Sequence, residues 1–156
     1  MSQLKAGDRA PDFTGTDKDG NPISLSDYQG RTLVLYFYPQ DATPTCTNQA
    51  CNLRDNLEAL AEHGISVVGV SPDDAASHRR FAEKQRLNFP LIADTDHRLI
   101  QAYGVWGEKQ MYGRSYMGLL RTTFVIGGDG VIRHVFPKPK VKEHAREILA
   151  ALGVGA

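Results

Sequence analysis

Residues 33–51 read LVLYFYPQDATPTCTNQAC and join a strand-like segment to a helix-like one. The first six residues are all apolar, which is typical of a strand buried on both faces of a sheet. Thr43 and Pro44 then have the pattern of a helix start, a hydroxyl residue at the N-cap followed by proline at the first helical position. The stretch therefore predicts a strand that leads directly into a helix. It also contains both cysteines of the chain, Cys46 and Cys51.

Strand-like and helix-like patterns alternate on both sides of this unit. Upstream, Asp19-Gly20 is typical of the turn between two hairpin strands. Downstream, the helix ends at Gly64 and has one apolar face. That face comprises Leu53, Leu57, Leu60 and Ala61. The other predicted elements are strands at 65–70 and 91–92, helices at 75–87, 97–103 and 141–152, and a hairpin of strands at 123–126 and 131–136. Residues 104–120 show no clear period, so no element is predicted there.

The order of these elements predicts the fold class. A strand, a helix and a strand, followed by a helix and a strand, a hairpin and a terminal helix, are what a thioredoxin-like α/β fold requires, here with a β-hairpin extension at the N-terminus. No repeat, low-complexity tract or linker interrupts the 156 residues, a length typical of one domain. We therefore predict a single domain over residues 1–156. Because such a fold supports many reactions, function has to be argued from the site.

Composition excludes several classes of partner. Eighteen Lys and Arg residues balance eighteen Asp and Glu residues without a sizeable block of either sign, so neither nucleic acid nor an anionic membrane is a predicted partner. The N-terminal segment lacks the apolar region of a signal peptide, and no apolar run approaches the roughly 20 residues of a membrane span. The sequence thus predicts a soluble, cytoplasmic protein. In that reducing compartment, a thiol pair serves catalysis or metal binding more often than a permanent cross-link.

Cys46 has the position of a reactive thiol. If the helix begins at Pro44, Cys46 is its third residue, where free amide hydrogens and the positive end of the helix dipole favour thiolate, the nucleophilic form. The position also lies just beyond the carboxyl end of a central strand, where open α/β sheets place their ligand sites. The alternative is a small buried apolar residue. The polar side chains around it favour the reactive thiol; they are Thr43, Thr45, Thr47, Asn48 and Gln49.

Cys51 leaves two interpretations open. The spacing of the two cysteines matches neither CxxC nor the paired ligands of a zinc site. Five residues along an α-helix place the two Cα atoms about 8.5 Å apart, beyond the roughly 7 Å that a disulfide can span. Either Cys51 is a packing residue, or the helix unwinds when the two sulfurs join.

Other candidates carry weaker signals. The five histidines show no helical pairing and are predicted at solvated surface positions rather than in a metal site. They are His63, His78, His97, His134 and His144. From the residues alone, Arg121 reads as a solvated cation at the start of a strand. No metal or cofactor site is predicted.

The motif Pro39-x-x-x-Thr43-x-x-Cys46 matches the active-site pattern PxxxTxxC of the peroxiredoxins in full. The longer stretch YFYPQDATPTCTNQACNLRDN resembles the branch of that family known as bacterioferritin comigratory protein or peroxiredoxin Q. The resemblance covers nearly the whole chain. Further matching segments are the opening APDF, NFPLIAD at 88–94, YGVWGEK at 103–109, and RTTFVI followed by DG within 121–130.

The resemblance implies a thioredoxin-fold thiol peroxidase that reduces hydrogen peroxide and organic hydroperoxides without a metal or organic cofactor. Cys46 would be the peroxidatic residue, whose thiolate attacks the O–O bond and becomes a sulfenic acid. Thr43 would hydrogen-bond the thiolate and orient the peroxide, and Pro39 would shield the sulfur from water. Arg121 would stabilise the thiolate and the developing charge. Gln49, where many relatives carry glutamate, would support that arginine.

Cys51 matches the resolving cysteine of some members of the branch. It would attack the sulfenic acid and leave an intramolecular disulfide for a thioredoxin-like protein to reduce. The helical spacing then predicts local unfolding in every turnover. Thr45 departs from the family, which usually has glycine there. We predict an atypical two-cysteine enzyme that works as a monomer; the competing classes are a thiol-disulfide oxidoreductase on the same fold, and a redox sensor whose output is a partner interaction.

Overall fold

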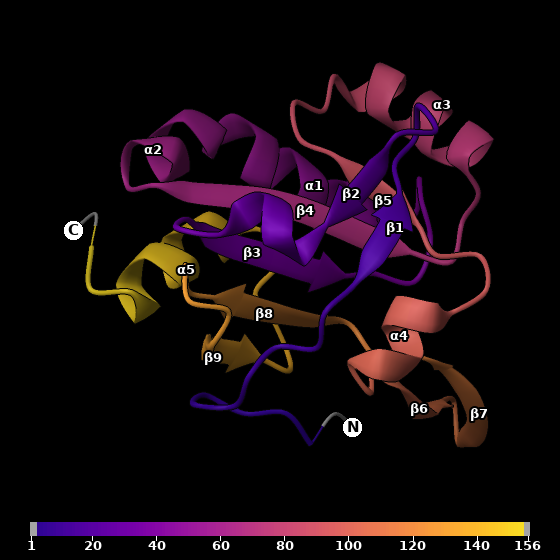
Figure 1. Cartoon of the computed structure of the whole chain (residues 1–156). Coiled ribbons are helices and arrows are strands. Elements are labelled where there is room, and N and C mark those ends of the chain that lie inside the picture. Colours follow the sequence, from indigo (N-terminus) through magenta and orange to yellow (C-terminus); the bar gives the residue numbers. More distant parts are fainter. Residues whose placement is uncertain (1–2, 155–156) are drawn as a thin grey trace.

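The strand predicted at residues 33–38 lies at the centre of a five-stranded sheet in a computed structural model, which describes residues 3–154 (Figure 1). This strand, β3 (Thr32–Phe37), is buried from residue 33 onward, as its continuous apolar run predicts. It pairs in parallel with β4 (Ile65–Ser71) and antiparallel with β8 (Thr122–Ile126). The strand order of the sheet is β5-β4-β3-β8-β9.

The two edge strands of the sheet were also predicted, at residues 91–92 and 131–136. β5 (Leu91–Ala93) pairs in parallel with β4, and β9 (Ile132–Phe136) pairs antiparallel with β8. The β8–β9 hairpin is joined by the glycine-rich segment 127–130, in which Gly130 adopts the positive φ of 81° that a side chain disfavours. The sheet is therefore mixed, with its parallel half in β3, β4 and β5.

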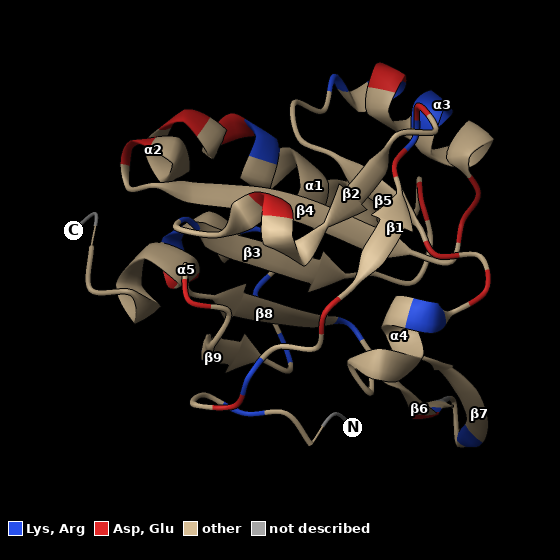
Figure 2. Ribbon diagram, viewed as in Figure 1, with Lys and Arg blue, Asp and Glu red and all other residues tan. Residues whose placement is uncertain are grey.

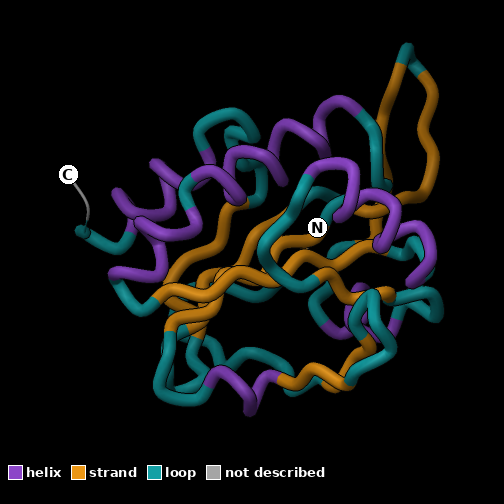
Figure 3. The backbone as a smooth tube through the Cα atoms, turned by 90° about the horizontal axis from the view of Figure 1, so that it is seen from above, coloured by secondary structure: helices purple, strands orange, loops and turns teal. Residues whose placement is uncertain are grey.

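Four helices share an apolar core with one face of the sheet. They are α1 (Pro44–Asp55), α2 (Leu57–Glu62), α3 (Ala75–Gln85) and α5 (His144–Ala151). Figure 3 shows helices gathered along one side of the strands. Tyr36 of β3 and Leu53 of α1 belong to this core, so α1 packs against the same strand from which it emerges.

The opposite face is covered by the N-terminal hairpin and two short helices. The hairpin, β1 (Thr14–Thr16) with β2 (Pro22–Ser24), was predicted from its Asp-Gly turn and is confirmed. The helices are η1 (Leu25–Tyr28), a 3-10 helix, and α4 (Arg98–Ala102). Buried residues of these segments, such as Ile23, join the second apolar cluster.

A second hairpin, for which no element was predicted, extends from the body of the molecule at one end (Figure 3). It consists of β6 (Trp106–Met111) and β7 (Arg114–Leu119). Its turn is Tyr112-Gly113, with φ values of 52° and 75°, and two-residue hairpin loops require positive φ of this kind. The turn dipeptide between two six-residue segments is a signal in the sequence that could have indicated it.

The helix predicted to run from Pro44 to Gly64 is instead two helices. Asn56, with φ −112° and ψ 9°, separates α1 from α2, and its side-chain amide donates to the Asn52 carbonyl oxygen at 2.8 Å. Leu53 and Leu60 are buried as predicted, but Ala61 is exposed because the break rotates the second apolar face. Helix predictions at 75–87 and 141–152 are correct in kind but too long.

Charged residues of both signs lie on α3 and at the end of α1, whereas α2 carries acidic residues only (Figure 2). Within residues 3–154, no helix has the length and apolar character needed to cross a membrane.

His144 anchors α5 to the sheet, and it is fully buried, so its predicted surface position is wrong. Its Nδ1 lies 2.6 Å from Glu147 Oε1 and its Nε2 lies 2.8 Å from Thr123 Oγ1 of β8. A neutral ring satisfies both contacts, since Nδ1–H donates to the carboxylate and Nε2 accepts from the hydroxyl. Burial lowers the pKa of His144, although the charge of Glu147 opposes this effect.

The lowered pKa of His144 predicts an acid-sensitive contribution to stability. The unfolded chain takes up a proton at His144 below about pH 6.5, before the folded chain does, so this contribution is present above that pH and is lost as the pH falls. We expect His144→Gln to destabilise the fold at pH 7.5, and the difference from wild type to shrink at pH 5.5. Urea unfolding at both pH values measures this. Equal differences at the two pH values would contradict the prediction.

Candidate active site

Cys46 lies at the start of α1, directly after the carboxyl end of β3. Thr43 is the N-cap, Pro44 is the first helical residue, and Cys46 is the third, as predicted. The Thr43 side chain makes no capping hydrogen bond, so it does not satisfy any of the first-turn amides near the sulfur. The sequence therefore places the thiol within the positive end of the helix.

Arg121 approaches Cys46 from the neighbouring strand. β8 begins at Thr122, which pairs with Phe37 at the end of β3, so the residue before β8 lies beside the start of α1. Arg121 Nη2 donates to Cys46 Sγ at 3.0 Å, and Nη1 donates to Gln49 Oε1 at 2.6 Å. The guanidinium thus bridges two side chains one helical turn apart on α1, and it is directed at the sulfur rather than at solvent.

The sulfur is more enclosed than the polar sequence around it suggests. Cys46 is 1% exposed and belongs to the apolar core between α1 and the sheet. Its neighbours on the inner face of the helix, Gln49, Ala50 and Leu53, are also buried, following the helical spacing. Thr45 and Asn48 are exposed, and Thr47 is half-buried. Composition alone could not show which side chain faces inward, and the guanidinium is the charged partner that makes a buried thiolate tolerable.

Two buried polar atoms close to the site lack partners. Among the described residues, Tyr36 Oη and Gln49 Nε2 have no hydrogen bond. Burial raises the pKa of Tyr36 well above its ordinary value of 10, and the charge of Cys46 raises it further. Tyr36 is therefore a neutral phenol beside the sulfur. Sequence reasoning missed it, although it lies on the same face of β3 as Val34 and Tyr38, the face that α1 covers.

Thr43 and Pro39 border the loop that leads from β3 to α1. Pro39 is half-buried at its start, and Thr43 is half-buried at its end. The Thr43 hydroxyl donates a hydrogen bond to the Gln40 carbonyl oxygen at 3.2 Å. The predicted hydrogen bond from Thr43 to Cys46 is therefore not made in this structure, because the single hydroxyl proton is directed to the backbone.

Cys51 is half-buried farther along α1 and faces α3. Its Sγ lies 3.5 Å from Gln85 Oε1, and Arg54 Nη1 donates to the Gln85 carbonyl oxygen at 2.6 Å. Both thiols are free, and α1 is continuous between them. Because ideal helix geometry separates residues five apart by about 8.5 Å, the two sulfurs can join only after part of α1 changes conformation.

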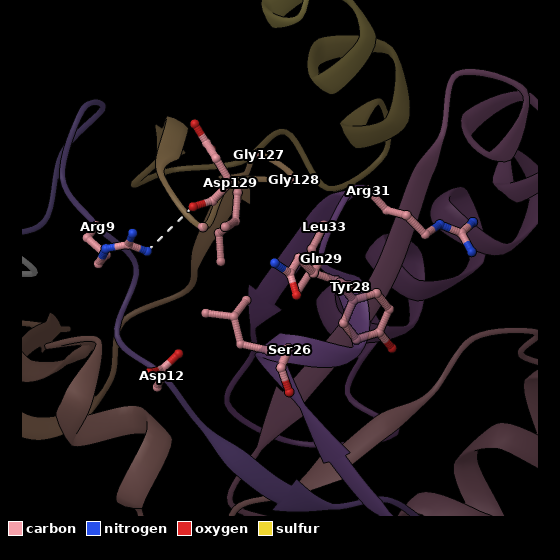
Figure 4. Close-up of a pocket in the computed structure, with 13 residues that line it drawn as sticks. Arg9, Asp12, Ser26, Tyr28, Gln29, Arg31, Leu33, Gly127, Gly128 and Asp129 are labelled. Carbon is pink, nitrogen blue, oxygen red and sulfur yellow. Dashed lines mark hydrogen bonds between the residues drawn. The ribbon is translucent and has the colours of Figure 1, made fainter.

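The remaining candidates do not converge on the thiols. Within the described part of the chain, no group of three or more His, Cys, Asp or Glu residues is arranged to hold a metal ion. His78 is fully buried, so its predicted surface position is wrong. A pocket of about 260 Å³ lies at the far end of the sheet, between the segment 25–33 and the β8–β9 turn (Figure 4). Neither cysteine lines it.

Comparisons with known proteins agree with this geometry. A family model described as the AhpC/TSA family matches residues 6–135. The chain is 47% identical over 149 residues to peroxiredoxin Bcp of Escherichia coli, with 96% of each chain covered.

Solved structures extend the likeness to the fold. A cysteine-to-serine mutant of PrxQ from Xylella fastidiosa superposes with a TM-score of 0.90 at 34% identity, covering 98% of each chain. The bacterioferritin comigratory protein of Xanthomonas campestris, studied for its alkyl peroxide reduction activity, gives a TM-score of 0.86 at 35% identity, again over 98% of each chain. The predicted thioredoxin-like fold class is confirmed. The chain therefore belongs to the AhpC/TSA family of peroxiredoxins, in its bacterioferritin comigratory protein or peroxiredoxin Q branch.

Proposed function

We propose that the chain is a thiol peroxidase in which Cys46 reduces hydrogen peroxide and organic hydroperoxides. The thiolate attacks one peroxide oxygen, the O–O bond breaks, Cys46 becomes a sulfenic acid, and water or an alcohol leaves after taking up a proton. The observation that carries this proposal is the 3.0 Å contact between Arg121 Nη2 and Cys46 Sγ at the buried start of α1. A fixed cation at this position favours thiolate and stabilises the negative charge that moves onto the leaving oxygen.

The other motif residues support this step. Gln49 accepts from the second amino group of Arg121 at 2.6 Å and holds the guanidinium in its plane. Thr43 carries a hydroxyl that turns from the Gln40 carbonyl oxygen to the bound peroxide, orienting it for attack. Pro39 lacks a backbone N–H and keeps water from the sulfur side of the loop.

Cys51 completes the cycle. Its thiol attacks the Cys46 sulfenic acid, an S–S bond forms, and the oxygen leaves as water, so the pair has lost two hydrogens in total. The first turns of α1 unwind to let the sulfurs meet. A thioredoxin-like dithiol then reduces the disulfide, which places the reaction in the cytoplasm, where such dithiols are kept reduced. Since one chain supplies Cys46, Cys51 and Arg121, we propose that residues 1–156 act as a single domain and a monomer.

The resolving step predicts different products in two variants. One equivalent of hydrogen peroxide should convert the reduced wild type to an intramolecular disulfide, whereas Cys51→Ser should stop at a sulfenic acid on Cys46. Intact-mass measurement after dimedone treatment separates the two, because dimedone adds to sulfenic acids and not to disulfides.

Turnover provides the matching control. With thioredoxin, its reductase and NADPH, Cys51→Ser should consume peroxide much more slowly than wild type. Wild-type turnover in Cys51→Ser would remove the resolving role and leave the role of Cys46 intact. A wild type that peroxide oxidises once, but that the thioredoxin system does not turn over, would instead point to the redox-sensor alternative.

A further inference from the structure

A second buried cluster lies beside the active-site loop and contains neither cysteine. Its centre is Asp41, which is 7% exposed, and its partner on α3 is His78, which is 0% exposed. Asp41 Oδ2 lies 2.7 Å from His78 Nδ1, Tyr38 Oη donates to Asp41 Oδ1 at 2.7 Å, and Ser77 Oγ donates to Asp41 Oδ2 at 2.8 Å. One carboxyl group thus ties the loop between β3 and α1 to the outer helix α3.

Both ring nitrogens of His78 have a hydrogen-bond partner. Nε2 lies 3.0 Å from the Ile92 carbonyl oxygen, and a carbonyl only accepts, so Nε2 carries hydrogen. Nδ1 faces the carboxyl oxygen of Asp41 at 2.7 Å, a distance at which two lone pairs would repel. The contact between Asp41 and His78 is therefore a short hydrogen bond between two buried side chains.

The backbone of the loop is fixed at the same point. The Asp41 amide donates to Asp73 Oδ2 at 2.7 Å, and Asp73 itself accepts from Ser71 Oγ at 2.9 Å. The next residue, Ala42, has φ 64°, a left-handed conformation that its Cβ disfavours, and its side chain is exposed. Such backbone strain persists only where the surroundings impose it. Here the contacts of Asp41 fix the residue directly before Ala42, and Thr43, the N-cap of α1, follows directly after it.

A second anchor lies just beyond Cys51. Asn52 Oδ1 accepts from the Ala145 amide at 2.8 Å, and Asn52 Nδ2 donates to the Lys142 carbonyl oxygen at 2.9 Å, which fixes this part of α1 to the start of α5. Both cysteines therefore lie between two fixed points, Asp41 and Asn52. A conformational change that brings the sulfurs together is confined to the segment between these anchors, with the strained Ala42 at one end.

We propose that Asp41 and His78 are positioning residues that hold Cys46 against Arg121 and restrain the unwinding of α1. The inference deepens the proposed function and rests on it. Weakening the Asp41–His78 contact releases the strain at Ala42, so the intact helix becomes less populated. The peroxide reaction, which needs Cys46 beside Arg121, then slows, and the attack by Cys51, which needs an unwound helix, accelerates.

The test measures the two steps separately in Asp41→Ala. The rate of Cys46 oxidation follows from competition with horseradish peroxidase for hydrogen peroxide, and disulfide formation follows from acid quenching and mass measurement. We expect oxidation about tenfold slower, the size of effect that one hydrogen bond to a charged group produces, together with disulfide formation several-fold faster. A loss of packing alone would not move the two rates in opposite directions.

Three further variants make the test specific. Asp41→Asn keeps the shape and can donate from its amide to His78 Nδ1, so it should recover most of the wild-type behaviour. Ser77→Ala removes one of the hydrogen bonds to the Asp41 carboxyl group. It should slow Cys46 oxidation and accelerate disulfide formation by smaller factors than Asp41→Ala. This variant therefore tests the proposal even if Asp41→Ala does not fold. Glu58→Ala, an exposed carboxylate on α2, should change neither rate.

The outcomes separate this inference from the proposed function. Opposite shifts in Asp41→Ala and Ser77→Ala, with recovery in Asp41→Asn, support the positioning role. Two rates that fall together, or that stay at wild-type values, would overturn it and leave the peroxidase intact. A wild type in which peroxide does not oxidise Cys46 would overturn both.

Discussion

Cys46→Ser is expected to abolish peroxide consumption supported by thioredoxin, its reductase and NADPH. The serine hydroxyl has nearly the same shape, fits the same buried site, and still accepts a hydrogen bond from Arg121, so the fold should persist. Serine, however, is not ionised near neutral pH, and within residues 3–154 no imidazole or carboxylate is hydrogen-bonded to Cys46 to act as a general base for it. A second-order rate indistinguishable from the reaction of peroxide with buffer is the expected result.

Two controls make the loss interpretable. A circular dichroism spectrum and a urea midpoint close to those of wild type would show that Cys46→Ser is folded. Cys51→Ser should still oxidise rapidly in a single turnover, because it retains the thiolate and its guanidinium. Residual catalytic turnover in Cys46→Ser would mean that another group reacts with the peroxide, and the mechanism proposed for Cys46 would be wrong.

The position of the reactive thiol could be predicted from local sequence because local rules determine it. An apolar strand, a loop, a threonine N-cap and proline at the first helical position place Cys46 in the first turn of α1, and the structure has it there. The pairing of Arg121 with Cys46 is different in kind. It depends on the antiparallel register of β8 with β3, and only the family resemblance indicated it.

The errors share a physical cause. His78 and His144 look like surface residues in the sequence because burial is a tertiary property. Asp74 lies four residues before His78 at helical spacing, yet it is not the carboxylate that His78 contacts. Their partners Asp41 and Thr123 lie 37 and 21 residues away and become neighbours only when the sheet forms. A polar side chain can be buried once such a partner exists, and composition carries no record of the pairing.

Arg121→Met is expected to produce the second largest loss, roughly 10²- to 10³-fold in the second-order rate with hydrogen peroxide, the range found when one charge-stabilising donor is removed from a buried active site. Methionine fills a similar volume without hydrogen-bond donors, so both the contact with Cys46 Sγ and the contact with Gln49 Oε1 disappear. Competition with horseradish peroxidase for hydrogen peroxide measures this rate. The attack of Cys51 on the Cys46 sulfenic acid should be little changed.

The geometry of the bridge decides how the conservative variants rank. The guanidinium makes its two contacts, at 3.0 Å to Cys46 and 2.6 Å to Gln49, through different nitrogens of one rigid plane. Arg121→Lys keeps the charge but loses the pair of donors held in one plane, so it should recover only part of the second-order rate. Gln49→Ala leaves the charge in place and should lower that rate about tenfold or less.

Equal rates for Arg121→Lys and wild type would show that charge alone suffices. Equal losses for Gln49→Ala and Arg121→Met would show instead that the orientation imposed by Gln49 is what Cys46 requires, because the cation is still present in the first variant and absent from the second.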